Sequence, residues 1–538
     1  MKKSILALSA AAVVGGLGFA GSAQALGYIG AGVAIGNSDA TNAQAADFAP
    51  GGVGHFLFVP YYSTQGTNAT LLNITNTDMQ HGKVVKVRFR GAANSDDILD
   101  FTLFLSPGDV WAGMIAKDPA TNLSQLSSDD KSCSIPAFKG TGGENPTFRT
   151  DRLPAYMSDA DQAAQTREGY IEILNMADIW ADTTAGSLYT NTKHVNGVAP
   201  CNYNATVFQN LLDGSWWTQA DAQKSPNDLA GATGKLMASW AIVNQDTWGT
   251  WSGTATAIAA LDAPAPAGKP GVGAIMFTPQ IEVPLPGGVT DAQMYTADPL
   301  LRAGLVNPLW FDLPDMSTPI VPQTDIGGPL RQAAVLSTQM GHIEVTNEYA
   351  LTNNGVPMDT DWVISQPTRR YFAAVQYGSS ASAAKLWWNP DIDAMTAGVF
   401  SSTGIAPISP WTSAGGNLNR YSLLSLTNGV ACMPVGFSSA SREEQFSAAV
   451  GQWSPGQSRP TCGEVITLSF SQAGAKSPLT ASLTNTSVTP AGKEGWGTVT
   501  LGGTTARALP VVGFSATSAL NGAKNGNLAM TLPHRWYK

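Results

Sequence analysis

The sequence of 538 residues is poor in charged side chains, in histidine and in long apolar runs. Only 13% of its residues are Asp, Glu, Lys or Arg, about half of the share in an average soluble protein. Its five histidines are dispersed, and no nucleophile elbow, zinc-protease or nucleotide-loop motif occurs. Beyond the first 25 residues, no apolar run approaches the ~18 residues of a membrane-spanning helix. We therefore predict a protein that is not an enzyme, with a hydrolase as the remote alternative.

The sequence is rich in turn residues, with 56 Gly and 33 Pro. Short runs of β-branched and aromatic residues occupy positions 56–59, 69–75, 83–89 and 98–105. Turn residues separate these runs, a rhythm that predicts an all-β fold of antiparallel Greek-key or immunoglobulin-like β-sandwich domains. We expect two short helices, at 158–167 and 441–450, because each segment begins with a serine that is followed by acidic residues.

The run at 83–90 shows the alternation of a strand with one buried face. Val85, Val87 and Phe89 alternate with basic residues. Because successive side chains of a strand point to opposite faces, the apolar residues are predicted in the core and the basic ones in water.

The first 25 residues have the form of a secretory signal peptide. Lys2 and Lys3 precede an apolar or small-residue run, and Ala23 and Ala25 frame a small-x-small site. We predict cleavage after Ala25 and an exported protein at the outer cell surface or in the medium. The mature chain then has 28 basic against 39 acidic residues, a formal net charge of −11. Such a balance argues against a nucleic-acid partner, whose phosphates attract basic surfaces.

Composition divides the mature chain into four segments. Residues 26–54 are rich in Gly and Ala and are predicted to form an N-terminal arm. A Pro- and Gly-rich linker at 263–271 would separate a first β-sandwich domain, 55–262, from a second, 272–538. One large sandwich with insertions is the alternative arrangement.

Four cysteines are present, without the spacing of a zinc site. Disulfides are expected in an exported protein, and three pairings are possible. Cys133 with Cys201 and Cys432 with Cys462 would close the shortest loops, so we favour this pairing without excluding the others.

Ca²⁺ is the candidate cofactor, on grounds of charge. The candidate ligands are the acidic residues of two Asp-x-Asp pairs, Asp359 with Asp361 and Asp391 with Asp393. Neither pair belongs to an EF-hand, because no Glu stands at the twelfth position of the loop.

Paired tryptophans are the candidates for a carbohydrate-binding site. They are Trp216 with Trp217 and Trp387 with Trp388. A flat indole stacks on a sugar ring, but adjacent residues of a strand point to opposite sides, and a buried aromatic core is the alternative use of these residues.

The sequences of several segments resemble those of a family of exported, largely uncharacterised, surface-layer-like proteins of the bacterial cell surface. The segments are 68–76 (NATLLNITN), 85–90 (VKVRFR), 105–111 (LSPGDVW), 361–370 (DWVISQPTRR) and 532–536 (LPHRW). The resemblance implies an extracellular, β-rich protein of a Gram-negative bacterium. It implies no active-site residue.

These observations lead to two hypotheses of function. The first is a secreted, non-catalytic structural protein of the cell surface that associates with its own copies, with Ca²⁺ as a bridging ion. The alternative is a secreted carbohydrate-binding or adhesion protein that uses exposed tryptophans and binds polysaccharide of the cell envelope.

Overall fold

The computed structural model describes residues 45–213, 225–261, 280, 336–337, 340–352, 355–388, 406–407, 424–446, 458–470, 477–501, 508–521 and 526–537. These residues form several sheets, almost entirely antiparallel, with a few short helices. The prediction of an all-β sandwich protein is therefore confirmed. The predicted signal peptide and the predicted linker lie outside the described residues. Within the described residues, no helix is long and apolar enough to cross a membrane.

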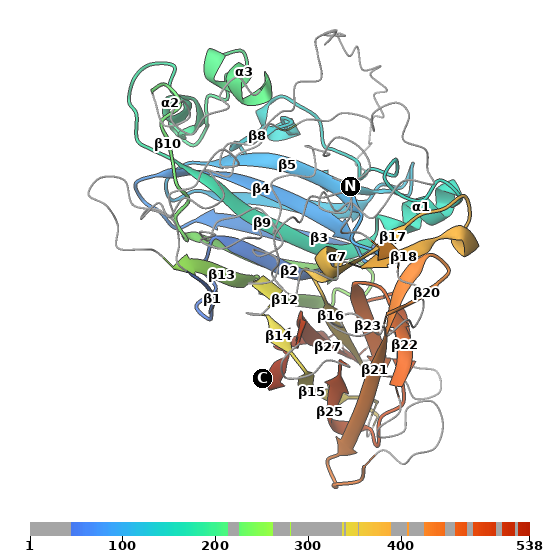
Figure 1. Cartoon of the computed structure of the whole chain (residues 1–538). Helices are drawn as coiled ribbons and strands as arrows, with labels where there is room; N and C mark the ends of the chain where they lie inside the picture. Colours follow the sequence, from blue (N-terminus) through green and yellow to red (C-terminus); the bar gives the residue numbers. More distant parts are fainter. Residues whose placement is uncertain are drawn as a thin grey trace.

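The first half of the chain, residues 45–261, forms two sheets that pack around one core. Figure 1 shows strands of the larger sheet side by side. Sheet 1 contains, in spatial order, β1 (Ala45–Ala49), β13 (Thr256–Leu261), β2 (Phe56–Ser63), β9 (Glu168–Ile179), β4 (Gly82–Gly91), β5 (Asp97–Leu105) and β8 (Cys133–Ile135), and β10 (Leu229–Ala230) also pairs with β9. Sheet 2 contains β12 (Thr250–Thr254), β11 (Leu236–Asn244), β3 (Asn68–Asn76), β6 (Val110–Lys117) and β7 (Ser124–Ser127).

Alternation of side chains explains how sheet 2 contributes to this sandwich. In β3, Leu72 and Ile74 are buried, whereas Leu71 and Asn73 are exposed. The buried residues join the core between the sheets, together with Trp111 of β6. A strand with period-two burial has one face in the core and one in solvent, and the strand predicted at residues 69–75 is confirmed.

The second half, residues 341–537, forms two further large sheets. Sheet 3 contains β20 (Ser425–Thr427), β21 (Val430–Ser441), β25 (Glu494–Thr500), β15 (Glu344–Ala350) and β29 (Arg535–Tyr537), and β22 (Ser458–Cys462) also pairs with β21. Sheet 4 contains β24 (Asn485–Val488), β23 (Val465–Phe470), β16 (Met358–Ser365), β27 (Val512–Asn521) and β28 (Gly526–Pro533). Two small sheets pair β14 (Gly341–His342) with β26 (Leu509–Pro510), and β17 (Ala373–Gln376) with β18 (Lys385–Trp388) and β19 (Ala406–Pro407).

Trp362 is at the centre of the core between sheets 3 and 4. Its ring is fully buried, 4.8 Å from the Phe470 ring and 6.1 Å from the Phe437 ring. The indole N–H donates to the main-chain oxygen of Glu348 at 3.0 Å. An aromatic residue of this size therefore buries its apolar surface without leaving its polar atom unpaired.

Among the described residues, helices are few and short. They are α1 (Asp159–Gln165), α2 (Leu188–Thr192), α3 (Thr206–Asp213) and α7 (Arg369–Phe372), with 3₁₀ turns at Lys139–Thr141 and Ala381–Ala383. The predicted helix at 158–167 is confirmed, and the Ser158 hydroxyl accepts a hydrogen bond from the Asp161 N–H as its N-cap. The predicted helix at 441–450 is wrong in its described part. Ser441 ends β21, and the residues after it form a turn, because acidic residues after a serine suit a turn as well as a helix.

The predicted N-terminal arm also differs from the structure. Residues 45–49 form β1, which pairs along its whole length with β13. Residues before His55, where we placed the domain boundary, therefore already pair with a strand of the first half. The small residues of β1 hid its strand character, because Ala has a low β propensity and only pairing with β13 makes the segment extended.

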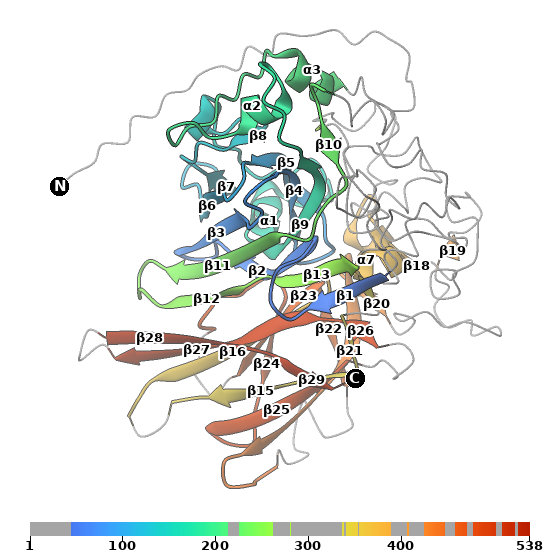
Figure 2. The same ribbon diagram turned by 90° about the vertical axis from the view of Figure 1, so that its left-hand side faces the viewer.

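Sheet 4 packs against the first half (Figure 2). The Phe514 ring of β27 lies 4.7 Å from the Trp240 ring of β11. Two hydrogen bonds cross the junction, which is the contact between sheet 4 and the first half. Asn68 Nδ2 donates to Leu479 O at 2.7 Å, and Trp251 Nε1 donates to Thr517 O at 3.2 Å. None of the sheets mixes strands of the two halves among the described residues, but their apolar faces form a shared core.

The sequence prediction is wrong for the basic side chains of β4. The apolar residues of β4 do face the sandwich core, but Lys86, Arg88 and Arg90 on the opposite face are also buried, rather than in water. Each is paired with a carboxylate. Asp100 of β5 lies 3.4 Å from the Lys86 ammonium and 3.0 Å from the Arg88 guanidinium, and Glu172 of β9 lies 3.3 Å from that of Arg90. Charges can be buried here because each has a partner of opposite sign on a neighbouring strand.

The second half covers part of this charged face. The Arg370 guanidinium of α7 donates to Glu172 at 2.6 Å and to the Tyr170 hydroxyl at 3.0 Å. Beside it, Arg369 lies 3.5 Å from Glu464, and Glu464 accepts a hydrogen bond from Ser95 of the first half. A buried ionic network therefore joins the two halves, and a single strand pattern cannot reveal what will cover its polar face.

Both favoured disulfides are present in the structure. Cys133 bonds Cys201, with 5.4 Å between the Cα atoms, and Cys432 bonds Cys462. The second pair occupies directly opposite positions of β21 and β22. Each disulfide therefore lies within one half of the chain.

Candidate functional site

The first pair of candidate Ca²⁺ ligands lies on β16, where Asp359 and Asp361 share a face of the strand. Asp361 is fully buried and accepts hydrogen bonds from the hydroxyls of Ser469 and Ser477 at 2.5 and 2.6 Å and from the Leu479 N–H at 3.1 Å. Both of its oxygens therefore already have protein donors.

The other candidate pair, Asp391 with Asp393, lies outside the described residues. Among the residues that the structure describes, no cluster of three or more His, Cys, Asp or Glu side chains could hold a metal ion. The Ca²⁺ hypothesis therefore stays a prediction that rests on the charge of the sequence.

Two buried carboxyl groups have raised pKa values. Burial raises the pKa of Asp361 from 3.8 to about 7, although its three hydrogen bonds act in the opposite direction. Burial likewise raises the pKa of Glu464 from 4.5 to about 7, and the nearby Arg369 and Arg370 limit the rise. Neither group lines the cavity of about 480 Å³ that lies between the two halves. The raised pKa values of Asp361 and Glu464 make the stability of the protein depend on pH.

The candidate sugar-stacking tryptophans are only partly described. Trp216 and Trp217 lie outside the described residues, and of Trp387 and Trp388 the structure describes the backbone, which pairs with β17. The carbohydrate hypothesis on these four residues stays a prediction. Elsewhere in the described chain, Trp248 is 74% exposed.

Two histidines, His55 and His534, are buried with a ring nitrogen close to a main-chain oxygen. The His55 ring nitrogen Nε2 lies 3.2 Å from the Ala232 oxygen, and that of His534 lies 2.9 Å from the Val363 oxygen. Burial lowers the pKa of each to about 4. Both side chains are therefore neutral at physiological pH and fixed by main-chain oxygens.

The outer face of sheet 2 is the most distinctive surface of the described chain. We call it the uncharged face. Its outward residues are Thr250, Ser252 and Thr254 of β12, Met237, Ser239, Ala241 and Val243 of β11, Leu71, Asn73 and Thr75 of β3, Val110, Ala112, Met114 and Ala116 of β6, and Gln125 and Ser127 of β7. All are exposed or half-buried, and none carries a charge. Figure 2 shows β3, β11 and β12 side by side.

Strand register brings the apolar residues of this face together. Ser252, Ala241, Leu71, Met114 and Ser127 are successive cross-strand neighbours, so one row crosses the whole sheet. Leu71 and Met114, at the centre of that row, are 39% and 42% exposed. Directly opposed side chains lie about 5 Å apart, so the two form a continuous apolar contact.

A second apolar pair lies further along the same strands. Val110 and Met237 are both cross-strand neighbours of Thr75, one on each side, and both are exposed. Small hydroxyl, amide and methyl groups fill the positions between the two pairs. The result is a surface without bulky charged side chains, which can lie against another flat surface.

Sequence reasoning identified β3 but missed this face. The signal was present in the alternation of β3 and β11, whose outward positions are neutral. What the sequence could not supply is the strand order β12-β11-β3-β6-β7, which places neutral positions from distant segments side by side. Only long-range pairing turns separate neutral residues into one surface.

Comparisons with protein families, with curated proteins and with solved structures find no match for this chain.

Proposed function

We propose that this chain is an exported, non-catalytic structural protein of the bacterial cell surface, which associates with its own copies through the uncharged face. The observation that carries the proposal is a solvent-exposed, five-stranded sheet surface whose outward residues carry no charge. The two disulfides support export, because such bonds persist in oxidising compartments.

Charge favours a second copy as the occupant of this face. The chain has a formal net charge of −9, so contact through most surfaces brings acidic groups of two copies together. An uncharged face avoids that repulsion, and in a two-fold contact the same patch meets itself. Leu71 and Met114 at its centre supply apolar area that is withdrawn from water when two copies meet.

The size of the face sets the strength of the contact. The five strands have 5, 9, 9, 8 and 4 residues, seven on average, and at a spacing of about 4.8 Å they give a patch of about 20 Å by about 25 Å. Two such patches bury about 1,000 Å² in total, which is the lower limit for a specific interface. A single contact should therefore be weak, and a stable layer would need several contacts on each copy.

Sedimentation velocity of the mature chain over a range of concentrations tests this proposal. We expect reversible association that weakens at least tenfold in the double variant Leu71→Glu, Met114→Glu, because the contact would then bury like charges. Val356→Glu is the matched control, since Val356 is also exposed but lies in the second half, outside the face. Equal melting temperatures would show that the variants fold.

Two results would contradict the proposal. One is a wild-type chain that stays monomeric at every concentration, and the other is a double variant that associates as strongly as Val356→Glu. Either result removes the uncharged face as a site of self-association.

Electron microscopy of the assembled protein tests the role of Ca²⁺. Sheets or filaments that form with Ca²⁺ and dissolve with EDTA would support bridging by the cation, as carboxylates of an acidic protein allow. Assemblies that EDTA leaves intact would remove Ca²⁺ from the proposal while leaving self-association through the uncharged face.

A further inference from the structure

A cavity of about 480 Å³ lies where the two halves meet. Residues of β1, β12 and β13 line it from the first half, and residues of β27, β28 and β29 line it from the second. Its volume is within the range of sites that bind small molecules, about 300–1,000 Å³. A cavity at a junction of two folded halves is also a common position for such sites.

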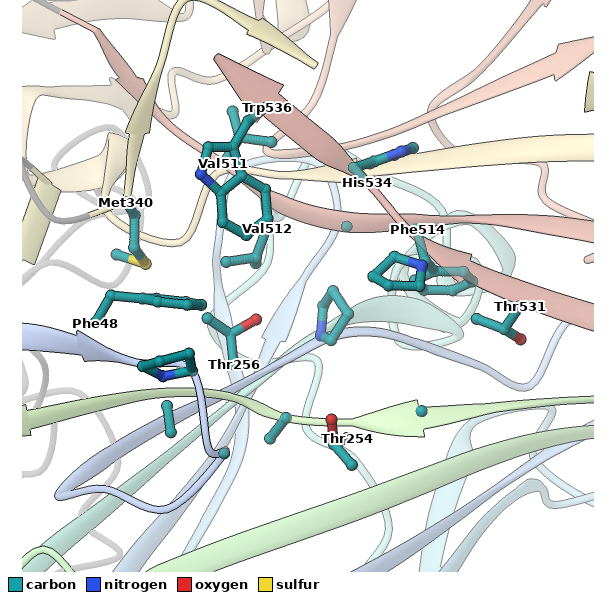
Figure 3. A pocket seen from close by; sticks show the side chains of 18 of the residues that line it. Phe48, Thr254, Thr256, Met340, Val511, Val512, Phe514, Thr531, His534 and Trp536 are labelled. Carbon is teal, nitrogen blue, oxygen red and sulfur yellow. The ribbon is translucent and has the colours of Figure 1, made fainter. Parts of the chain in front are cut away.

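Aromatic rings form one wall of the cavity (Figure 3). The Trp536 ring stacks on the His342 ring with 4.6 Å between their centroids, and it meets the Phe48 ring edge-on at 5.7 Å. Trp536 is 46% exposed, so the aromatic wall is accessible to a ligand. Figure 3 shows Met340 beside Phe48, which extends the apolar wall.

The remaining walls are aliphatic, aromatic and hydroxyl-bearing. Val511, Val512 and Phe514 contribute apolar surface from the second half. Thr254 and Thr256 lie across the cavity from them (Figure 3). Both threonines are at least partly exposed, so their hydroxyls can donate to or accept from a ligand.

The cavity is uncharged. No Asp, Glu, Lys or Arg is among the described residues that line it. His534 is neutral because burial lowers its pKa to about 4, and its ring nitrogens already face Val363 O and Asn347 Nδ2. A charged ligand would lose its hydration without gaining an ion pair, a cost of several kcal/mol.

The polar groups also limit how hydrophilic the ligand can be. A sugar carries many hydroxyls, and each needs a partner when it is buried. Among the described residues, the cavity offers hydroxyl, imidazole and indole groups but no Asn, Gln or carboxylate side chain. The lining therefore suits a molecule with one or two polar groups rather than a monosaccharide.

We propose that this cavity binds an uncharged, predominantly apolar ring compound that packs its ring against Trp536 and Phe48 and offers a hydroxyl or carbonyl oxygen to Thr254 or Thr256. The proposal does not depend on self-association, because Trp536, Phe48 and Thr256 lie outside the uncharged face; Thr254, on the edge strand β12, belongs to both surfaces. Binding would stabilise the junction, since the ligand contacts both halves.

Fluorescence of N-phenyl-1-naphthylamine, an uncharged two-ring probe, tests the proposal on the mature chain. We expect saturable binding with increased probe fluorescence. The matched pair of competitors is 1-naphthol and 1-naphthalenesulfonate, which share a ring system and differ in charge. 1-Naphthol should displace the probe at concentrations at least tenfold lower than 1-naphthalenesulfonate.

Two variants locate the site. Trp536→Ala removes the aromatic wall, and Thr256→Phe fills the cavity without removing that wall, so each should weaken probe binding at least tenfold. Trp248→Ala and Thr250→Phe are the matched controls, because both residues are exposed and neither lines the cavity. Thermal melting of each variant checks that it folds.

Three outcomes would overturn the proposal. They are no saturable binding of the probe, equal displacement by the anion and by 1-naphthol, and unchanged binding in a folded Thr256→Phe variant. The last outcome would place the probe elsewhere, even if Trp536→Ala failed to fold.

Discussion

Replacing Asp361 by asparagine should change how the stability of this protein depends on pH. The carboxyl has a pKa of about 7 in the folded chain against 3.8 as its ordinary value, with burial as the main cause. The folded state therefore keeps a proton that the unfolded state releases between about pH 4 and pH 7. The contribution of Asp361 to the free energy of unfolding must fall as pH rises through this window, because the unfolded state gains more from its deprotonation.

The size of the effect follows from the same two pKa values. Each pH unit between them is worth about 1.4 kcal/mol, so Asp361 alone should lower the free energy of unfolding by about 2.5 kcal/mol from pH 5 to pH 8. Glu464, with a pKa also near 7, should contribute a similar amount. Asp361→Asn removes the first contribution and keeps a side-chain carbonyl that can accept from Ser469 or Ser477.

Urea unfolding followed by tryptophan fluorescence at pH 5, 6, 7 and 8 measures the effect. We expect the free energy of unfolding of Asp361→Asn, taken relative to the wild type, to rise by about 2.5 kcal/mol from pH 5 to pH 8. The buried His55 and His534, whose pKa values are lowered to about 4, add stability as pH rises, but they do so in both proteins, so the difference between the two isolates Asp361. Asp129→Asn, at an exposed position, should behave as the wild type. Parallel curves for the wild type and Asp361→Asn would refute the reasoning, because they would show that Asp361 titrates alike in the folded and unfolded chain.

Three further changes test what holds the fold together, each measured as the free energy of unfolding in urea. Arg370→Met leaves the buried Glu172 without its closest partner and should cost about 3–5 kcal/mol; a loss below about 1 kcal/mol would show that this ion pair does not stabilise the junction. Reduction of Cys133–Cys201, which closes a loop of 68 residues, should cost about 4 kcal/mol through the entropy of the unfolded chain, and equal stability of oxidised and reduced protein would contradict this. Trp362→Ala should cost about 3–5 kcal/mol because it leaves a cavity between sheets 3 and 4, and a variant as stable as the wild type would mean that the core closes around the gap.

Local patterns in the sequence predicted the elements that depend on neighbours along the chain. The N-cap at Ser158 was correct because capping involves residues only three positions apart. The alternation of β4 correctly predicted its inner face, because Val85, Val87 and Phe89 lie in the core. The same alternation failed for Arg88, since the outer face of β4 is covered rather than wet.

The surfaces that carry the proposals depend on pairing between distant segments. Leu71 and Met114 become neighbours through the pairing of β3 with β6, and Phe48 meets Trp536 although the two lie at opposite ends of the chain. The sequence contains no local signal for either contact, because strand order and the packing of the halves decide them. A sequence pattern could therefore indicate sheets but not which of their faces would be neutral or enclosed.

The positions of the two disulfides have a mechanical consequence. Cys133–Cys201 lies in the first half and Cys432–Cys462 in the second, so neither crosses the junction. The described contacts across the junction are non-covalent, among them the pair of Arg370 with Glu172. Under tension between the two ends of the chain, the halves should separate before either is pulled apart inside its disulfide loop. The protein would then extend in steps and dissipate load, and the first step would have the same force with and without a reducing agent.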